Sequence, residues 1–111
     1  MMKPEEQQLI MAAYSGDADL VTELLKKDVN PNVRDKNGIT ALSWASSAGR
    51  FKVVEVLLQY GADDTLPDNR GRTALQSATL NGHQTVAQLL RTPPPPLSSY
   101  QSADRQNKKH K

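Results

Sequence analysis

A repeat with a period of 33 residues constrains this chain more than any other feature of its sequence. The eight residues that begin at Gly38 return 33 positions later, beginning at Gly71, with the same Gly, Thr, Ala, Leu and Ala. A third, less regular copy precedes them, and five columns of apolar residues and glycine run through all three copies. The columns are Leu9, Leu42 and Leu75; Ala12, Ala45 and Ala78; Gly16, Gly49 and Gly82; Leu20, Val53 and Val86; and Leu24, Leu57 and Leu90. Such units bury their apolar faces against one another, so the period predicts a stack of three similar units.

Each unit has the pattern of two short helices joined by a tight turn. In the middle unit Thr40 is a suitable N-cap for the first helix, because its hydroxyl can accept a hydrogen bond from an early backbone N–H. Gly49 follows this helix at a position that favours a left-handed backbone, which costs little only for glycine. Apolar residues then recur at spacings of three and four over residues 53–58, which predicts a second helix that ends at Gly61. Residues 62–71 are rich in turn formers, which predicts a projecting loop or β-hairpin between units.

The composition excludes several kinds of chemistry. Because the chain has no cysteine, it has no disulfide, no thiolate nucleophile and no cysteine-based zinc or iron–sulfur site. It has two histidines and none of the common hydrolase, zinc-binding or nucleotide-binding motifs. His83 follows a helix-ending glycine, where a structural or solvated role is expected. The aspartates Asp63, Asp64 and Asp68 lack the ligand order of an EF-hand and are interpreted as turn residues. We therefore predict a non-enzyme with no catalytic residue, metal site, cofactor or small-molecule substrate.

The charge of the chain is concentrated at its C-terminal end. The net charge is +2, but residues 1–91 carry 10 Lys and Arg against 11 Asp and Glu, whereas residues 92–111 carry 4 against 1. A nucleic-acid-binding domain is expected to carry a basic stripe on its folded body, so nucleic acid is a disfavoured partner. No apolar run approaches the roughly 18 residues of a membrane helix, and we expect a soluble, intracellular protein with no membrane partner.

The composition changes abruptly at Thr92, and residues 92–111 are predicted to form a disordered tail after a folded domain of residues 1–91. Pro93–Pro96 are predicted to form a short polyproline II segment, which we interpret as a linker; the alternative is a ligand for an SH3, WW or EVH1 domain. Lys108–Lys111 are interpreted as a solubilising end, and the alternative is a nuclear import signal or a contact for anionic partners.

The middle unit resembles the ankyrin repeat. The resemblance rests on the segment from Asp35 to Leu42, on Gly49, on the apolar run at 53–58 and on Gly61-Ala62-Asp63, and it extends over roughly residues 3–91. It implies an all-α solenoid of three helix-turn-helix units with β-turn or hairpin loops. The units span about 3–34, 35–67 and 68–91.

Two features depart from the family pattern. Both regular copies open with Thr-Ala-Leu followed by Ser43 or Gln76, where the family has Thr-Pro-Leu-His, which implies looser local order without a change of fold. Terminal units of such arrays need polar outer faces. The first unit accordingly has Glu6, Gln7 and Gln8 at its start, and the last unit has Ser77 in place of the middle unit's Trp44, which is expected to be a packing residue.

The resemblance also implies a function, which is to bind another protein through a concave surface made of loop tips and the exposed side of the first helices. Carried over position by position, the contact residues are Tyr14 in the first unit; Arg34, Lys36, Asn37, Ile39 and Ser47 in the second; and Asn69, Arg70, Arg72, Leu80 and Asn81 in the third. Four cations in this set predict a protein or peptide partner with negative charge. We expect a monomeric, cytoplasmic scaffold or adaptor. The alternative is a nuclear or nucleic-acid-associated regulatory factor that uses the basic tail.

Overall fold

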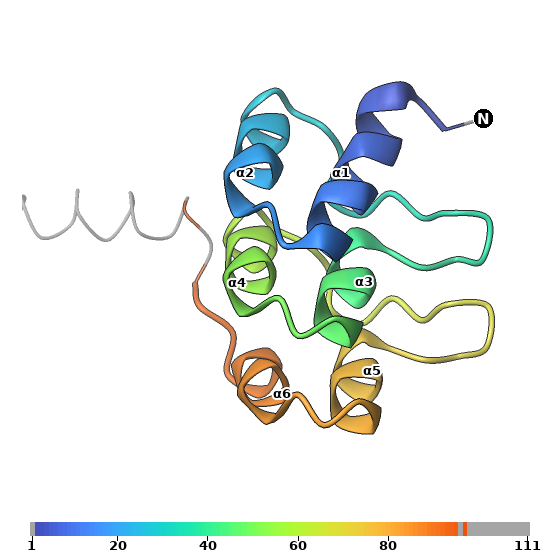
Figure 1. The fold of residues 1–111 in the computed structure, drawn as a ribbon, viewed down its shortest axis with the longest axis vertical. Coiled ribbons are helices and arrows are strands. Elements are labelled where there is room, and N and C mark those ends of the chain that lie inside the picture. The colour runs from blue at the N-terminus through green and yellow to red at the C-terminus, as the bar shows by residue number, and fades with distance from the viewer. Residues whose placement is uncertain (1, 96, 98–111) are drawn as a thin grey trace, which may run out of the picture.

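The computed structural model describes residues 2–95 and 97, and in them it shows six helices and no strand. The helices are α1 (Pro4–Ser15), α2 (Ala18–Lys26), α3 (Ala41–Ser47), α4 (Phe51–Gln59), α5 (Ala74–Leu80) and α6 (Gln84–Arg91). Consecutive helices pair within each unit, and the units stack so that α1, α3 and α5 form one layer and α2, α4 and α6 the other (Figure 1). The predicted all-α repeat solenoid is confirmed.

The stack is held together by the columns of the repeat. Leu9, Leu42 and Leu57 have at most 1% of their surface exposed, and they lie in one continuous core with the other apolar columns. Each such side chain contributes about 1.5–3 kcal/mol of burial free energy. Because neighbouring units share this core, no unit can bury its apolar face alone.

The helices of the middle unit begin and end where the sequence signals place them. The hydroxyl of Thr40 accepts a hydrogen bond from the Ser43 amide at 3.1 Å, which caps α3. Past the ends of α3 and α4, Gly49 and Gly61 have φ values of 74° and 88°, in the left-handed region. In the first unit Asp28 occupies the place of Gly61 with φ of 67°.

Helix α1 differs from its counterparts because it is longer. It has 12 residues, whereas α3 and α5 have seven each, and it starts at Pro4 rather than after the residue aligned with Thr40. Proline is favoured at the first position of a helix, and the carboxylate of Glu6 accepts a hydrogen bond from the Lys3 amide at 2.9 Å. The polar start of the first unit therefore adds helix before the repeat pattern begins.

Two loops extend from the α1, α3 and α5 layer on the side away from the other helices (Figure 1). They are hairpin-like, since the Asp35 amide donates to the Ile39 carbonyl at 3.0 Å and the Asp68 amide to the Arg72 carbonyl at 2.9 Å. Among the described residues the strand-like pairing is limited to one isolated antiparallel bridge between Arg34 and Thr40. The loops therefore project as tight turns beside the first helices.

Candidate functional site

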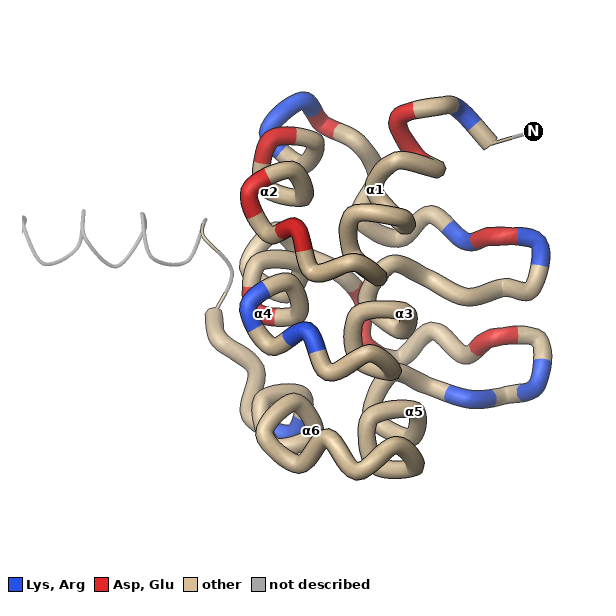
Figure 2. Tube along the Cα trace, viewed as in Figure 1, with Lys and Arg blue, Asp and Glu red and all other residues tan. Residues whose placement is uncertain are grey.

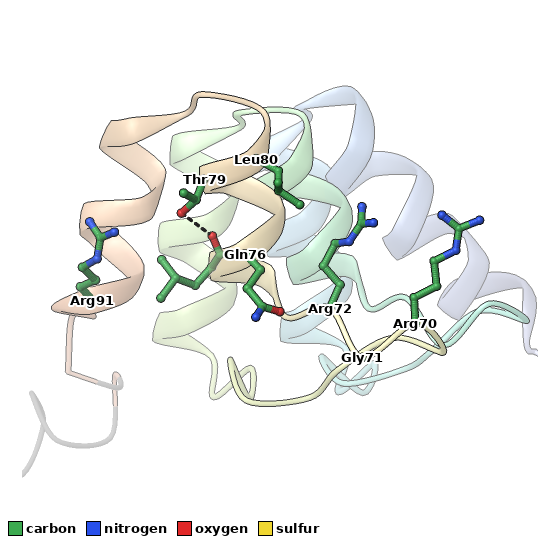
Figure 3. Close-up of a pocket in the computed structure, with 8 residues that line it drawn as sticks. Arg70, Gly71, Arg72, Gln76, Thr79, Leu80 and Arg91 are labelled. Atoms are coloured by element: carbon green, nitrogen blue, oxygen red, sulfur yellow. Dashed lines mark hydrogen bonds between the residues drawn. The ribbon is translucent and has the colours of Figure 1, made fainter.

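The loops and the first helices border three hollows that follow one another along the stack. The N-terminal hollow has a volume of about 650 Å³, and Gln7, Ile10, Met11, Lys36, Asn37 and Trp44 are among its lining residues. The middle hollow, about 280 Å³, is lined by Asn37, Ile39, Asp68, Asn69, Arg70 and Arg72. The C-terminal hollow, about 570 Å³, is lined by Arg70, Arg72, Leu75, Gln76, Thr79, Leu80 and Arg91, among others (Figure 3). Asn37 is shared by the first two hollows, and Arg70 and Arg72 by the last two, so the row is continuous.

An aspartate organises each loop by accepting hydrogen bonds from its backbone. The Asp35 carboxylate accepts from the amides of Asn37 and Ile39, and the Asp68 carboxylate from those of Arg70 and Arg72, all at 2.9 Å. The Arg72 amide is the main reason that the pKa of Asp68 lies below its ordinary value of 3.8, since it stabilises the charged form. The acidic groups of the loops therefore face the backbone of their own turns.

Several predicted contact residues join neighbouring repeats instead of standing free. Arg34 donates from its guanidinium group to the Pro67 carbonyl of the next loop and, at 3.3 Å, to the Gly38 carbonyl of its own. The amide and side chain of Asn69 donate to the carbonyls of Asn37 and Lys36 at 3.0 and 3.2 Å. These hydrogen bonds fix the distance between the two loops.

The last two inner helices are joined in the same way. The Asn81 side chain donates to the carbonyl of Ser47 at 2.9 Å and to its hydroxyl at 2.8 Å. Both residues were predicted as partner contacts, and the structure gives each a role in holding α5 against α3.

Lys36, Arg70 and Arg72 have side chains without an acidic partner. In residues 2–95 the one ion pair joins Lys52 and Glu55 at 3.2 Å, far from the loops in sequence and on α4. Figure 2 shows both Lys or Arg and Asp on each loop, and further acidic residues on α1 and on α2 with its N-cap. The hollows are therefore bordered by Lys36, Arg70 and Arg72 together with Asp35 and Asp68, whose carboxylates bond to the backbone of their own turns.

Tyr14 and Leu80 lie apart from the middle of this row. The Tyr14 ring, 53% exposed, meets the Trp44 ring edge-on with centroids 5.3 Å apart. Trp44 is half-buried, consistent with the expected packing role, and its indole N–H donates to the Asp35 carboxylate at 2.9 Å. Leu80 is 68% exposed and borders the C-terminal hollow. These two members of the predicted set therefore lie outside the middle hollow, which other predicted residues line.

Sequence reasoning missed other residues that line the hollows. Gln7, Ile10 and Met11 line the N-terminal hollow from α1, where Met11 stands in the place of the middle unit's Trp44 and is 63% exposed. Leu75, Gln76 and Arg91 line the C-terminal hollow because no further unit covers α5 and α6 among the described residues. The signal for these was the lack of a fourth copy of the repeat after Leu90.

The remaining titratable residues have structural surroundings. The Asp63 carboxylate accepts from the Thr65 amide at 2.9 Å, and its hydrogen bonds to Thr65 keep the pKa of Asp63 below 3.8. Across the described part of the chain, no three His, Cys, Asp or Glu side chains gather as a metal site would require. His83 is half-buried at the start of α6, next to Gly49. Pro96, part of the segment predicted to be a linker or a ligand, lies outside the described residues. So do residues 104–111, for which a solubilising role, a targeting role or contact with anionic partners was predicted.

None of the helices in the described part of the chain combines the length and apolar content needed to cross a bilayer.

Comparison with known proteins identifies the repeat. Residues 9–95 match the family model for ankyrin repeats, with three copies. The chain is 35% identical over 82 residues to a potassium channel of Arabidopsis thaliana; the match covers 74% of the chain and 10% of the channel. It is 39% identical over 82 residues to a probable palmitoyltransferase of Saccharomyces uvarum; this match covers 68% of the chain and 11% of that protein. It is also 34% identical over 87 residues to an ankyrin repeat protein of Acanthamoeba polyphaga mimivirus, covering 78% of the chain and 21% of that protein.

Ankyrin repeats generally mediate protein–protein interaction and are generally non-catalytic. The family model covers most of the chain, and its three copies equal in number the three helix pairs of the structure's described residues. This chain belongs to the ankyrin repeat family.

Proposed function

We propose that this chain is a non-catalytic binding module whose partner is an acidic protein or peptide segment, bound along the loops and the exposed side of α1, α3 and α5. The observation that carries the proposal is the continuous row of hollows bordered by Lys36, Arg70 and Arg72, none of which pairs with an acidic side chain in residues 2–95.

The electrostatic part of the argument depends on where the loop carboxylates point. Asp35 and Asp68 lie beside these cations, but each accepts hydrogen bonds from two backbone amides of its own turn. Asp68 also interacts electrostatically with Arg70 and Arg72, but neither arginine forms an ion pair with it, and the two loops together carry more cations than carboxylates. Such a surface attracts negatively charged partners and speeds their association.

Affinity also needs apolar anchoring, since surface charge pairs contribute only about 0–1 kcal/mol each. The N-terminal hollow offers it, because Ile10, Met11 and Trp44 lie among its lining residues. Met11 is 63% exposed, and the half-buried Trp44 ring is held by its bond to Asp35. Large apolar and aromatic side chains in such positions supply most of the binding energy of protein interfaces. The partner is therefore an acidic segment that also carries an apolar side chain for this hollow.

A peptide library displayed on phage tests this proposal. Selection on the wild-type chain is expected to enrich peptides rich in Asp and Glu with one or two large apolar residues. A variant with Lys36→Glu and Arg70→Glu should lose these peptides, because both side chains are exposed and make no hydrogen bond that the fold needs. The matched control is Lys26→Glu with Lys27→Glu, the same charge change at the C-terminal end of α2 in the other helix layer.

The thermal melting of all three proteins is measured alongside the selection. Loss of the acidic peptides by the loop variant alone, at unchanged melting temperature, supports the proposal. Enrichment of neutral or basic peptides, or equal retention by both variants, contradicts it.

A further inference from the structure

We propose that the open end of the stack is a second docking surface, and that its occupant is an acidic helix of another protein. This end face comprises Arg72, Leu75, Gln76, Thr79, Leu80 and Arg91, on the last unit (Figure 3). It goes beyond the function proposed above, because it uses the outer side of α5 and α6; with the row of loops it shares the C-terminal hollow and Arg72.

Comparison of equivalent positions in the repeat shows what this face lacks. In the middle unit Leu42, Ser43 and Ser46 are buried, because α5 packs over α3. Their counterparts 33 residues later are Leu75, Gln76 and Thr79, of which the first is half-buried and the other two are exposed. The same surface that is covered in the middle unit is therefore uncovered in the last one.

The glycines lead to the same conclusion. A methyl group added to Gly49 would meet the His83 ring 2.6 Å away, and one added to Gly38 would meet Asn69 at 2.5 Å, because the following unit lies against both. At the equivalent Gly82 and Gly71 nothing lies within 4 Å. The last unit thus presents a surface with the shape of an internal junction.

The chain itself does not cover this end as far as the structure describes it. After α6 the backbone turns back along the stack, and Pro93 and Pro94 line a hollow with Leu58, Gly61 and Ala62 of the middle unit (Figure 1). Residues 104–111 have four Lys and Arg against one Asp, so their charge opposes contact with the end face.

The charge of the face selects the occupant. Arg70, Arg72 and Arg91 line the C-terminal hollow together with no acidic residue, and Arg91 stands where the middle unit has Leu58. A second copy docked through the same face would set these arginines against one another, which is unfavourable. An acidic partner has the complementary charge.

The shape of the face selects a helix. In the stack the equivalent surface of α3 is filled by another helix, α5, and here Leu75 and Leu80 supply the apolar floor that such a helix needs. Two polar groups of the face keep a partner when covered, because the Thr79 hydroxyl donates to the Leu75 carbonyl at 2.8 Å and the Gln76 side-chain oxygen accepts from the Thr73 amide at 3.0 Å. The expected ligand is a helix with a stripe of leucines flanked by glutamates.

A defined peptide tests the proposal on the full chain. The probe is a capped helical peptide of Glu, Leu and Ala, with leucines every third or fourth residue and glutamates on both sides of that stripe; its counterpart has Gln in place of every Glu. Titration into the ¹⁵N-labelled protein should shift the amide signals of Leu75, Thr79, Leu80 and Arg91. The variants Arg91→Glu and Leu80→Glu should each weaken binding by about tenfold or more, which corresponds to about 1.4 kcal/mol.

Lys26→Glu, at the C-terminal end of α2 in the other helix layer, is the matched charge reversal outside both surfaces, and it should leave the affinity for this probe unchanged. Equal binding of the Gln peptide, signal shifts confined to the loops, or unchanged affinity in both end-face variants would overturn the proposal. So would contacts of residues 98–111 with Leu80 in the free chain, or a dimer that Arg91→Glu dissociates, since the occupant would then be the tail or a second copy. The library selection tests the loop surface separately, so failure of the end-face proposal and failure of the proposed function can be told apart.

Discussion

Leu57 lies at the centre of the middle unit, in α4, with no exposed surface. Helices α2 and α6 flank α4 on either side, so the side chain is enclosed by all three units. Replacement by alanine removes three carbon atoms from a place that cannot collapse without moving two neighbouring units. Leu57→Ala is therefore expected to be the most destabilising leucine truncation in the stack.

The magnitude follows from the burial of the side chain. Truncation of a fully buried leucine costs about 2–5 kcal/mol, as lost transfer free energy and as the cavity left behind. At about 0.05–0.15 kcal/mol per residue, a domain of this size has a free energy of unfolding of roughly 5–14 kcal/mol. The variant loses a large part of that free energy, and its melting temperature should fall by at least about 8 °C.

Urea unfolding followed by far-ultraviolet circular dichroism and by Trp44 fluorescence measures the effect. Leu80→Ala is the matched control, because it removes the same atoms from a side chain that is 68% exposed, and it should change stability by no more than about 0.5 kcal/mol. Leu24→Ala and Leu90→Ala, at the same column in the outer units, should fall between the two, because each has a neighbouring unit on one side only. Equal losses for Leu57→Ala and Leu80→Ala would refute the reasoning.

Two further substitutions test the helix ends and the loops. Gly49→Ala should lower the free energy of unfolding, measured in urea, by more than Gly82→Ala does. Both glycines have φ near 75°, which costs alanine about 1–2 kcal/mol, but only at Gly49 does the next unit obstruct the added methyl group. Equal losses would show that the two units do not pack as described. Asp68→Asn should flatten the acid dependence of stability, because a carboxylate whose pKa is lowered on folding stabilises the protein above pH 3.8 and loses that contribution as the pH falls through the lowered pKa. Urea midpoints at several values between pH 6 and pH 2 measure this slope, and an unchanged slope in the variant would count against the role given to the loop carboxylate.

Much of the fold was predictable from the sequence because its signals act over short distances. Thr40 caps α3 through a residue three positions away, and Gly49 ends the helix through its own backbone angle. The apolar columns repeat in every unit, so the pairing of helices and the all-α class followed from the period. The start of α1 was missed because Pro4 and the glutamates after it lie outside the repeat pattern.

The candidate surface was only partly predictable. Lys36, Arg70 and Arg72 were expected to border it, and they line the hollows. Arg34, Asn69 and Asn81 were placed in the same group, but their side chains bond to a neighbouring repeat. Position in the repeat identifies which residues come near the surface, but it does not show which of them already have a partner.

The sequence alone determined the period, the helix ends and the family, because capping bonds, backbone angles and apolar spacing depend on residues only a few positions apart. The tertiary structure decided the rest. The bonds from Asn81 to Ser47 and from Arg34 to Pro67 join residues 34 and 33 positions apart, and they form only once one repeat lies against the next. Stacking likewise decided that the α3 surface is buried while the equivalent α5 surface is open, although the two helices have nearly the same local pattern.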